Sequence, residues 1–411
     1  MHRTFVLVVA LTLCCTSLAQ PPKVNTGIEV LRESGFSLLK GKRVGLITNP
    51  TGVDSKLKST IDILYESKVV NLVALFGPEH GVRGNIPAGE KIDNSVDSLT
   101  GLPAYSLYGK TRKPTPEMLK GIEVLVYDIQ DIGIRSYTYI STMGLAMEAA
   151  AEHGIAFVVL DRPNPLGGLK VEGNIVEKGF ESFVGQYPIP YIYGLTCGEL
   201  ATLLNGEKLL SSGKKCSLTV VPMKGWKRTM TFEDTGLPWV PTSPHIPEAT
   251  TPAYCASTGI AGELGVFSEG VGTPLPFRLF AAEWINAQRF ATALNALNIA
   301  GLSFQPISFT PSYGKFKDRN LHGVQISITD LQRASLMSVQ FLCLQVHHEL
   351  YPERNPFSMA DSLHLAMFDK VCGTDQVRKR FVRRMKFPDI KKFLEKDVRS
   401  FRRTSSRYYL Y

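Results

Sequence analysis

Short runs of apolar, largely β-branched residues recur along the first half of the chain, and each ends abruptly at Gly, Pro or a polar residue. These runs cover residues 41–49, 69–76, 122–129, 155–160 and 218–221, with a weaker one at 103–108. Helical patterns lie between them at residues 57–67, 114–120 and 139–152, and another begins after the capping pair Thr196 and Glu199. Strands that alternate with helices in this way predict an α/β fold with a parallel sheet.

The second half of the chain changes pattern after a proline-dense segment at residues 238–252. Helical patterns over residues 283–297 and 331–350 flank one strand pattern at 323–328, which predicts a smaller α+β domain. A chain of 411 residues is also too long for one ordinary core. We therefore expect a first domain over residues 20–252 and a second over residues 253–411.

Residues 1–19 resemble a secretory signal peptide, with a basic start, an apolar middle and the small-residue exit S-L-A before Gln20. Cleavage there predicts a secreted or periplasmic protein. A lipid anchor at Cys14 or Cys15 is the alternative, and the bulky Leu13 disfavours it. No other stretch of the sequence is apolar and long enough to cross a bilayer.

Five cysteines remain after this cleavage, and they are scattered without any C-x-x-C pair. They are Cys197, Cys216, Cys255, Cys343 and Cys372. This spacing argues against a disulfide framework and a structural zinc site, although one bridge stays open, so we expect mostly buried thiols. The first strand is not followed by G-x-G-x-x-G or a P-loop, and we expect neither a cofactor nor a metal.

The net charge of +9 is concentrated at the C-terminal end of the chain. Residues 370–411 hold 14 Lys and Arg against 4 Asp and Glu, and apolar residues alternate with them, which predicts amphipathic helices. An anionic polymer or a membrane surface suits an exported basic face better than nucleic acid does. A merely solvated basic face is the default interpretation.

Chemistry-bearing residues gather where the predicted strands end. The strand at 69–76 runs into G-P-E-H-G-V-R-G, which places Glu79, His80 and Arg83 within five residues. Ligands of open α/β sheets bind at the carboxyl ends of the strands, so these three side chains are candidate site residues. Ion pairing with neighbours in a polar loop is the alternative interpretation.

Two further strand ends repeat this pattern, with Y-D-I-Q-D-I-G-I-R-S-Y-T-Y after one and D-R-P-N-P-L-G-G, then V-E-G-N, after the next. A stretch rich in Pro and Tyr follows at residues 183–193, where tyrosines suit a sugar-binding wall or packing under a loop equally well. The candidate residues of these segments are Asp128, Gln130, Asp131, Arg135, Tyr137, Tyr139, Asp161, Arg162, Asn164, Glu172 and Tyr193. Three strand ends that carry acids and arginines predict one shared site.

Acids, arginines and tyrosines without a metal-ligand pattern favour glycoside hydrolysis. That reaction needs an acid that protonates the leaving oxygen and a group that stabilises an oxocarbenium-like transition state. Glu79 suits the acid, because desolvation beside His80 and a proline would keep its carboxyl group protonated. The sequence lacks the G-x-S-x-G elbow of serine hydrolases, and His80 beside Glu79 is weak support for a metal.

Four motifs in order carry a resemblance to a known family: F-G-P-E-H-G-V-R-G, Y-D-I-Q-D-I-G-I-R-S-Y-T-Y, L-D-R-P-N-P-L-G-G with V-E-G-N, and G-V-Q-I-S-I-T-D. Together with the ending R-Y-Y-L-Y, they are similar to the NamZ family of exo-acting β-N-acetylmuramidases. The resemblance implies a Rossmann-like catalytic domain, a smaller C-terminal domain and an active site in the cleft between them. It also implies release of N-acetylmuramic acid from the non-reducing ends of peptidoglycan glycan strands, with Glu79 as the leading catalytic acid.

The sequence departs from the family pattern G-[RT]-G-T-x-R-P-F in one segment, where G-V-G-T-P-L-P-F places Leu275 at the position of the arginine. If that arginine holds the lactyl carboxylate of the substrate, affinity or specificity changes here. Arg278, three residues further on, is the nearest substitute in the sequence.

Beyond Glu79, the mechanism is a hypothesis built on the 2-acetamido group of muramic acid, which can act as the nucleophile. Asp131 or Glu172 would then orient that group. Candidates for binding the lactyl carboxylate are Arg83, Arg135 and Arg162. The alternatives are a non-catalytic protein that binds cell-wall glycan and a hydrolase of another acidic sugar or ester.

Overall fold

Seven strands form the sheet of the first domain, in the order β3-β4-β2-β1-β5-β6-β7. They are β1 (Arg43–Thr48), β2 (Asn71–Gly77), β3 (Ser95–Val96), β4 (Pro103–Ser106), β5 (Val124–Asp128), β6 (Ala156–Leu160) and β7 (Leu218–Val221). All neighbouring pairs are parallel except β3 with β4. This computed structural model describes residues 24–79, 81–84, 94–211 and 213–411, and within them it confirms the predicted parallel sheet.

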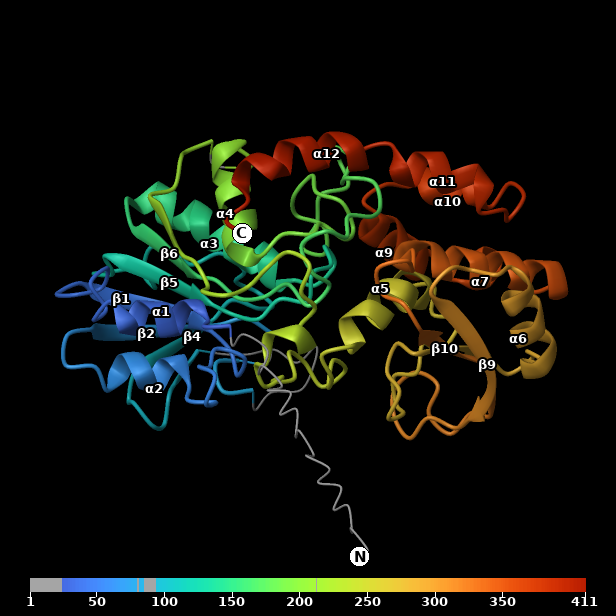
Figure 1. Ribbon diagram of the computed structural model, residues 1–411, viewed down its shortest axis with the longest axis horizontal. Helices are drawn as coiled ribbons and strands as arrows, with labels where there is room; N and C mark the ends of the chain where they lie inside the picture. The colour runs from blue at the N-terminus through green and yellow to red at the C-terminus, as the bar shows by residue number, and fades with distance from the viewer. Residues whose placement is uncertain (1–23, 80, 85–93, 212) are drawn as a thin grey trace, which may run out of the picture.

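Helices cover both faces of this sheet (Figure 1). They are α1 (Gly27–Glu33), α2 (Thr60–Tyr65), α3 (Tyr139–His153) and α4 (Cys197–Gly206). Successive strand residues alternate between the two cores, so that Val124 and Val126 pack with α1 and α2 while Leu125 and Tyr127 pack with α3 and α4. A parallel sheet buried on both faces produces the near-continuous apolar runs that the sequence shows.

The second domain is built on an antiparallel sheet of three strands, with β10 (Leu321–Ile328) between β8 (Leu279–Ala282) and β9 (Leu302–Phe309). Its helices are α5 (Thr251–Gly262), α6 (Ala287–Ala296), α7 (Leu336–Leu350), α8 (Pro356–Met359), α9 (Ser362–Cys372), α10 (Gln376–Phe381), α11 (Pro388–Glu395) and α12 (Val398–Ser405). The predicted α+β domain is therefore confirmed.

Two sequence-based expectations need correction. Residues 114–120 form a hydrogen-bonded turn rather than a helix, although Thr115 Oγ1 accepts from the backbone N–H of Met118 as a cap would. Helix α5 was not predicted, because its small residues give no clear apolar stripe: ten of its twelve residues are buried, polar Ser257 and Thr258 among them.

The strand order creates a crevice at the carboxyl edge of the sheet. The chain moves from β1 outward to β2 and β4, and then from β5 outward in the opposite direction to β6 and β7. The segments that leave β1 and β5 therefore separate, and ligands of open α/β sheets bind at such a switch point.

The C-terminal helices return to the first domain and join the two domains together (Figure 1). Phe401 of α12 belongs to the core that α3 and α4 share. The hydroxyl of Tyr411, the last residue, donates to buried Asp161 Oδ2 over 2.8 Å and accepts from the N–H of Met223 over 2.8 Å. Arg228 stacks on Tyr409 at 3.4 Å from its ring centroid.

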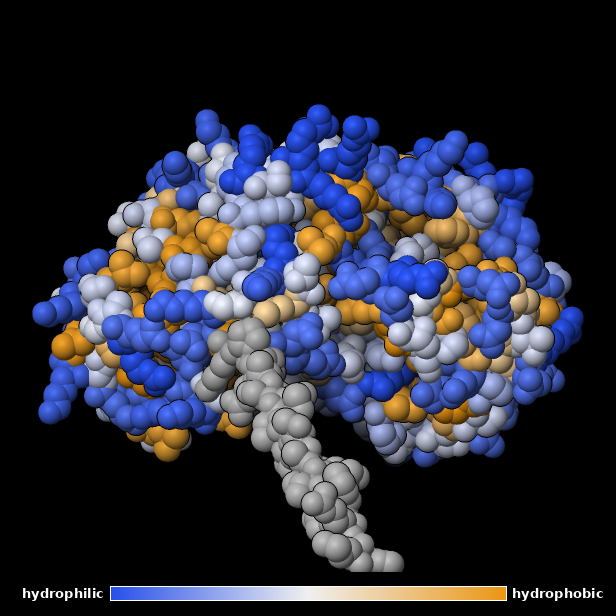
Figure 2. All heavy atoms as spheres, in the orientation of Figure 1, coloured by the Kyte–Doolittle hydropathy of each residue, from blue (hydrophilic) through white to orange (hydrophobic). Residues whose placement is uncertain are grey.

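Helices α10, α11 and α12 confirm the predicted helical form of the basic C-terminal end. Figure 2 shows hydrophilic side chains along the edge that these helices form. The five described cysteines are all free and buried, as expected. No helix in the described part of the chain is long and apolar enough to cross a membrane.

We predict that Tyr411→Phe lowers the free energy of unfolding by about 1–3 kcal/mol, because buried Asp161 loses a hydrogen-bond donor. Chemical unfolding followed by circular dichroism measures this loss. Tyr409→Phe is the matched control, because the Tyr409 hydroxyl makes no hydrogen bond within the described residues. Equal stability of Tyr411→Phe and the wild type would contradict the proposed anchoring role.

Candidate active site

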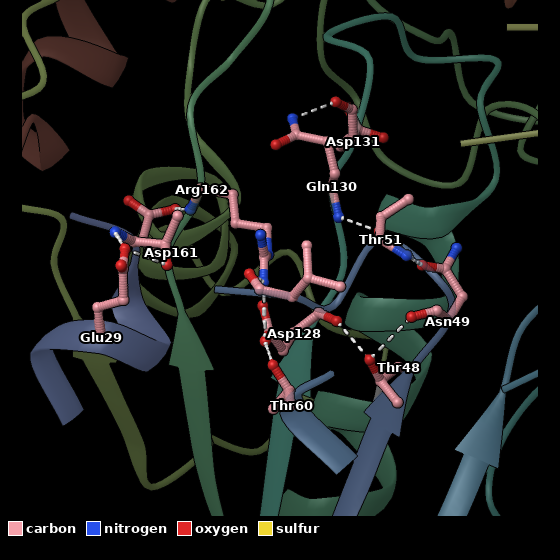
Figure 3. A network of polar contacts seen from close by, with 12 residues as sticks. Glu29, Thr48, Asn49, Thr51, Thr60, Asp128, Gln130, Asp131, Asp161 and Arg162 are labelled. Atoms are coloured by element: carbon pink, nitrogen blue, oxygen red, sulfur yellow. Dashed lines mark hydrogen bonds and ion pairs between the residues drawn. The ribbon is translucent and has the colours of Figure 1, made fainter. Parts of the chain in front are cut away.

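A buried ion pair occupies the carboxyl ends of β5 and β6 (Figure 3). Asp128 accepts from Arg162 Nε over 2.5 Å and from Arg162 Nη2 over 3.0 Å, and it also accepts from Thr60 Oγ1 over 2.5 Å. The Asp128 side chain is fully buried and that of Arg162 is 6% exposed. Both were predicted to bind substrate; in the structure the Asp128 carboxylate and the Nε and Nη2 atoms of Arg162 form hydrogen bonds within the protein.

The same network extends to the loop after β1. The backbone N–H of Gln130 donates to Thr51 Oγ1 over 2.8 Å, and the Gln130 side chain donates through Nε2 to the carbonyl of Pro163 over 2.7 Å. Thr48 Oγ1 donates to the backbone carbonyl of Asp128 over 2.9 Å. Gln130 was a predicted substrate ligand, and the structure instead places it as a link between the loops that follow β1, β5 and β6.

Asp161 and Asn164 also serve local structure rather than a cavity. Asp161 accepts from Thr196 Oγ1 over 2.7 Å and from the N–H of Gly198 over 2.8 Å at the start of α4. Burial raises the pKa of Asp161 to about 6. Asn164 donates to the carbonyl of Leu195 over 2.9 Å, which fixes the loop after β6. In the structure, Asp161 and Asn164 therefore stabilise local backbone and do not line the cavity that holds Glu79.

Arg135 and Arg83, two candidates for binding the lactyl carboxylate, both form hydrogen bonds with other groups of the protein. Arg135 is 1% exposed and donates to the carbonyls of Asn174, Ile189 and Val371 over 2.7–2.8 Å, which ties both domains together. Burial lowers its pKa to about 10.

Arg83 forms ion pairs with Asp97 over 2.8 Å and with Asp62 over 3.1 Å. Its hydrogen bond to Asp97 lowers the pKa of that carboxyl group to about 2. Arg83 therefore forms ion pairs with its neighbours, which is the alternative interpretation that the sequence analysis gave for this loop.

Neither predicted second acid lines the cavity that holds Glu79. Glu172 accepts from the N–H of Met337 over 2.9 Å and so caps α7 from the first domain, beside Lys170. Asp131 is buried, accepts from the N–H of Gly133 over 2.7 Å and from the Tyr193 hydroxyl, and burial raises its pKa to about 6. Tyr193 is 1% exposed and faces Asp131 rather than a sugar site.

A cavity of about 440 Å³ lies between the two domains and contains the remaining candidates. Its lining residues are Glu79, Ile134, Ser136, Tyr137, Thr138, Tyr139, Val184, Ser243, His245, Ile246, Cys255, Gly259, Gly262, Glu263, Glu269, Val271, Phe277 and Val371. The first domain supplies the ends of β2 and β5, and the second domain supplies α5 and the turn that follows it.

Glu79 reaches this cavity directly after β2. Its carboxylate accepts a hydrogen bond from the Tyr108 hydroxyl, and partial burial together with the charge of Glu79 raises the pKa of Tyr108 to about 12. Tyr108 follows β4, the strand next to β2. His80 lies outside the described residues.

Two tyrosines form one wall of the cavity at the start of α3. The rings of Tyr137 and Tyr139 meet edge to face, with centroids 4.8 Å apart. Their hydroxyls donate to Thr242, Tyr137 to Oγ1 over 2.8 Å and Tyr139 to the backbone carbonyl over 2.5 Å. These bonds fix the rings, so Tyr137 presents a rigid and partly exposed aromatic surface to a ligand.

The second domain contributes two acids, Glu263 and Glu269, that were not predicted as site residues. They follow α5 in a Gly-rich segment without periodicity, so the sequence offered only the Gly-flanked position of Glu269 as a signal. Phe277, which closes this segment on the cavity wall, has φ +64°. A non-glycine residue in that region is held by its surroundings and often marks a functional site.

Leu275, which replaces the arginine of the family pattern, does not line the cavity. Arg278 does not replace it either, because its guanidinium pairs with Glu248, contacts Thr250 Oγ1 over 2.9 Å and stacks over Tyr254. Within the described residues, no Lys or Arg lines the cavity, and no group of three or more His, Cys, Asp or Glu is arranged to hold a metal.

We predict that Arg162→Met destabilises the fold by about 3–5 kcal/mol, because it leaves Asp128 as an unpaired buried charge. The double variant Asp128→Asn with Arg162→Met should recover part of that loss. Denaturant unfolding of the two variants measures both effects. A normal unfolding midpoint for Arg162→Met would show that the ion pair does not hold these strand ends.

Comparison with known proteins places the chain in a family. A model described as exo-beta-N-acetylmuramidase NamZ, N-terminal, matches residues 44–250, and its C-terminal counterpart matches residues 254–411. The chain is 46% identical over 393 residues to the peptidoglycan beta-N-acetylmuramidase NamZ of Bacillus subtilis (strain 168), an alignment that covers 96% of this chain and 92% of that protein.

Two crystal structures of DUF1343 family proteins from Bacteroides fragilis NCTC 9343 have the same fold. One superposes with a TM-score of 0.92 at 57% identity, and the other with a TM-score of 0.73 at 31% identity. Each comparison covers 95% of this chain and 99% of the solved one. The chain therefore belongs to the NamZ family.

Proposed function

We propose that this protein is a glycosidase that releases N-acetylmuramic acid from the non-reducing ends of peptidoglycan glycan strands. The observation that carries the proposal is the carboxyl group of Glu79 on the wall of an interdomain cavity of about 440 Å³, a volume typical of small-molecule sites. The names of the matching family model and of the B. subtilis relative support the reaction and the sugar.

Glu79 serves as the general acid in this proposal. Its carboxyl group protonates the glycosidic oxygen as the bond to C1 breaks, and its carboxylate later accepts a proton from water. The Tyr108 hydroxyl, which donates to Glu79, fixes the orientation of the carboxyl group. The rigid ring of Tyr137 offers a surface for the C–H face of the sugar.

The charge on the cavity wall is unusual for a site that takes an acidic sugar, because Glu79, Glu263 and Glu269 are the acids present and no described Lys or Arg accompanies them. The N-terminal turn of α3 contributes the compensating positive potential, since Thr138 and Tyr139 at its start line the same cavity. We infer that this helix end faces the anionic part of the substrate.

We also propose that the protein is exported and meets its substrate in the cell envelope. The basis is the leader-like composition of residues 1–19, which lie outside the described residues.

We predict that Glu79→Gln loses about 10²–10⁴ of the wild-type rate on a disaccharide of N-acetylmuramic acid and N-acetylglucosamine, because the leaving oxygen then receives no proton. The loss in kcat/KM, which reports the steps up to departure of the leaving group, should be much smaller on p-nitrophenyl β-N-acetylmuramic acid, whose leaving group needs little protonation. Initial rates on both substrates measure this difference.

Glu283→Gln is the matched control, because Glu283 pairs with Arg319 on the surface of the second domain. Circular dichroism checks that every variant is folded. Near-normal turnover of the disaccharide by Glu79→Gln would remove Glu79 from the mechanism. A folded wild-type protein that binds the sugar but cleaves neither substrate would indicate a glycan-binding protein instead.

A further inference from the structure

A pair of carboxyl groups lies on the cavity wall that the second domain supplies. Glu263 directly follows α5, and Glu269 follows six residues later. Backbone hydrogen bonds between Ser268 and Ala281 of β8, at 2.9 and 3.1 Å, anchor the segment that carries Glu269. Both acids therefore project from backbone that α5 and β8 hold in place.

The Glu269 side chain lies against the end of α5, where Glu263 follows Gly262. A Cβ atom on Gly262 would lie 3.3 Å from Glu269 Oε2, so the absence of a side chain there leaves room for the carboxylate. Glu263 is next to Gly262 in the chain, and the charge of Glu269 acts on it. The two carboxyl groups therefore line the same cavity and influence each other electrostatically.

No ion pair neutralises these carboxyl groups within the described residues. The nearest cationic groups, Lys315 and His364, contact each other at 3.0 Å, and His364 pairs with Asp361 over 2.9 Å. Both acids are half-buried on the cavity wall, and partly desolvated carboxyl groups without an ion-pair partner are typical of functional sites.

Burial raises the pKa of Glu263 to about 7, with the charge of Glu269 as the second cause, and burial also raises the pKa of Glu269. Because the two acids interact, they titrate as a unit, and both pKa values lie above the ordinary range of a glutamate. Other titratable or charged groups that face the pair or share its cavity are Glu79, Tyr137, Tyr139, His245, Cys255, Lys315, His364 and Cys372.

We propose that Glu269, with Glu263 as its proton-sharing neighbour, is the second functional carboxyl group of the reaction and binds the N–H of the substrate's 2-acetamido group. This inference rests on the proposed function. It replaces the sequence-based candidates Asp131 and Glu172, because neither of these lines the cavity that holds Glu79.

The proposed hydrolysis of the glycosidic bond takes two steps. In the first, the acetamido carbonyl oxygen forms a bond to C1, the electrons of the broken C1–O bond go to the leaving oxygen, and Glu79 gives that oxygen its proton. The acetamido N–H proton passes to Glu269, and a neutral oxazoline forms. In the second, water forms a bond to C1 and gives a proton to Glu79, the C1–O bond of the oxazoline breaks and its electrons return to the acetamido group, and the proton on Glu269 returns to nitrogen.

The proton shared with Glu263 limits the negative charge that the substrate meets. A fully ionised pair would repel the lactyl carboxylate of N-acetylmuramic acid at close range, whereas the singly protonated pair keeps one carboxylate for the acetamido N–H. In this proposal, the two carboxyl groups together bind the acetamido N–H and limit the repulsion of the lactyl carboxylate.

The experiment compares the wild type, Glu269→Gln, Glu269→Asp and the control Glu283→Gln on p-nitrophenyl β-N-acetylmuramic acid and on the disaccharide. We expect Glu269→Gln to lose about 10²–10³ in kcat on both substrates, because stabilisation of the developing positive charge does not depend on the leaving group. KM should change little, and Glu269→Asp should recover part of the rate.

This pattern differs from that of Glu79→Gln, whose loss depends on the leaving group. A folded Glu269→Gln with wild-type kcat on both substrates would overturn the inference and leave the proposed function intact. A loss confined to the disaccharide would overturn it too, since it would make Glu269 part of the acid step. A wild-type protein inactive on both substrates would overturn the proposed function and this inference together.

A pH profile tests the role of Glu263 separately. With the p-nitrophenyl substrate, wild-type kcat/KM should fall as the pH rises through about 7, because the pair then loses its proton. Glu263→Gln cannot ionise at this position and should keep its activity above that pH. A profile of Glu263→Gln identical to that of the wild type would contradict proton sharing by this pair.

Discussion

The buried ion pair between Arg162 and Asp128 is the constraint on which the rest of the first domain depends. It joins the ends of β5 and β6. Thr60, the first residue of α2, donates its hydroxyl to the same Asp128 carboxylate. A buried charge pair persists only when its hydrogen bonds are complete. These polar groups therefore bond to one another and stabilise the strand ends that border the crevice. The residues that line the cavity lie further along the loops.

The cavity exists because the two domains are fixed against each other at several points. Arg135 of the first domain donates to Val371 of α9, Glu172 caps α7, and Tyr411 returns to Asp161 at the end of β6. Arg135, Glu172, Tyr411 and Asp161 do not line the cavity, whereas Val371 does, so these contacts border the site. They allow the acid of the first domain and the carboxyl pair of the second to face one cavity.

The sequence was sufficient to predict β10, six of the seven strands of the first sheet, and an α/β fold followed by a smaller α+β domain, but not β3, β8 or β9. Periodicity shows which residues end a strand, but it does not show which polar side chains pair with each other. Asp128 and Arg162 were candidate ligands because each lies at a strand end, and their separation of 34 positions gave no sign that they pair with each other. Glu263 and Glu269 escaped prediction because they meet the site only through the packing of α5, a helix without an apolar stripe.

The most direct test of this account is a crystal structure of Glu79→Gln soaked with a disaccharide that has N-acetylmuramic acid at its non-reducing end. We expect the terminal sugar in the interdomain cavity, with its glycosidic oxygen beside residue 79 and its acetamido group beside Glu269. The contradicting result is a sugar bound only in the separate cavity of about 470 Å³ lined by Glu172, Lys391 and Arg399. Binding there would move the site away from Glu79 altogether.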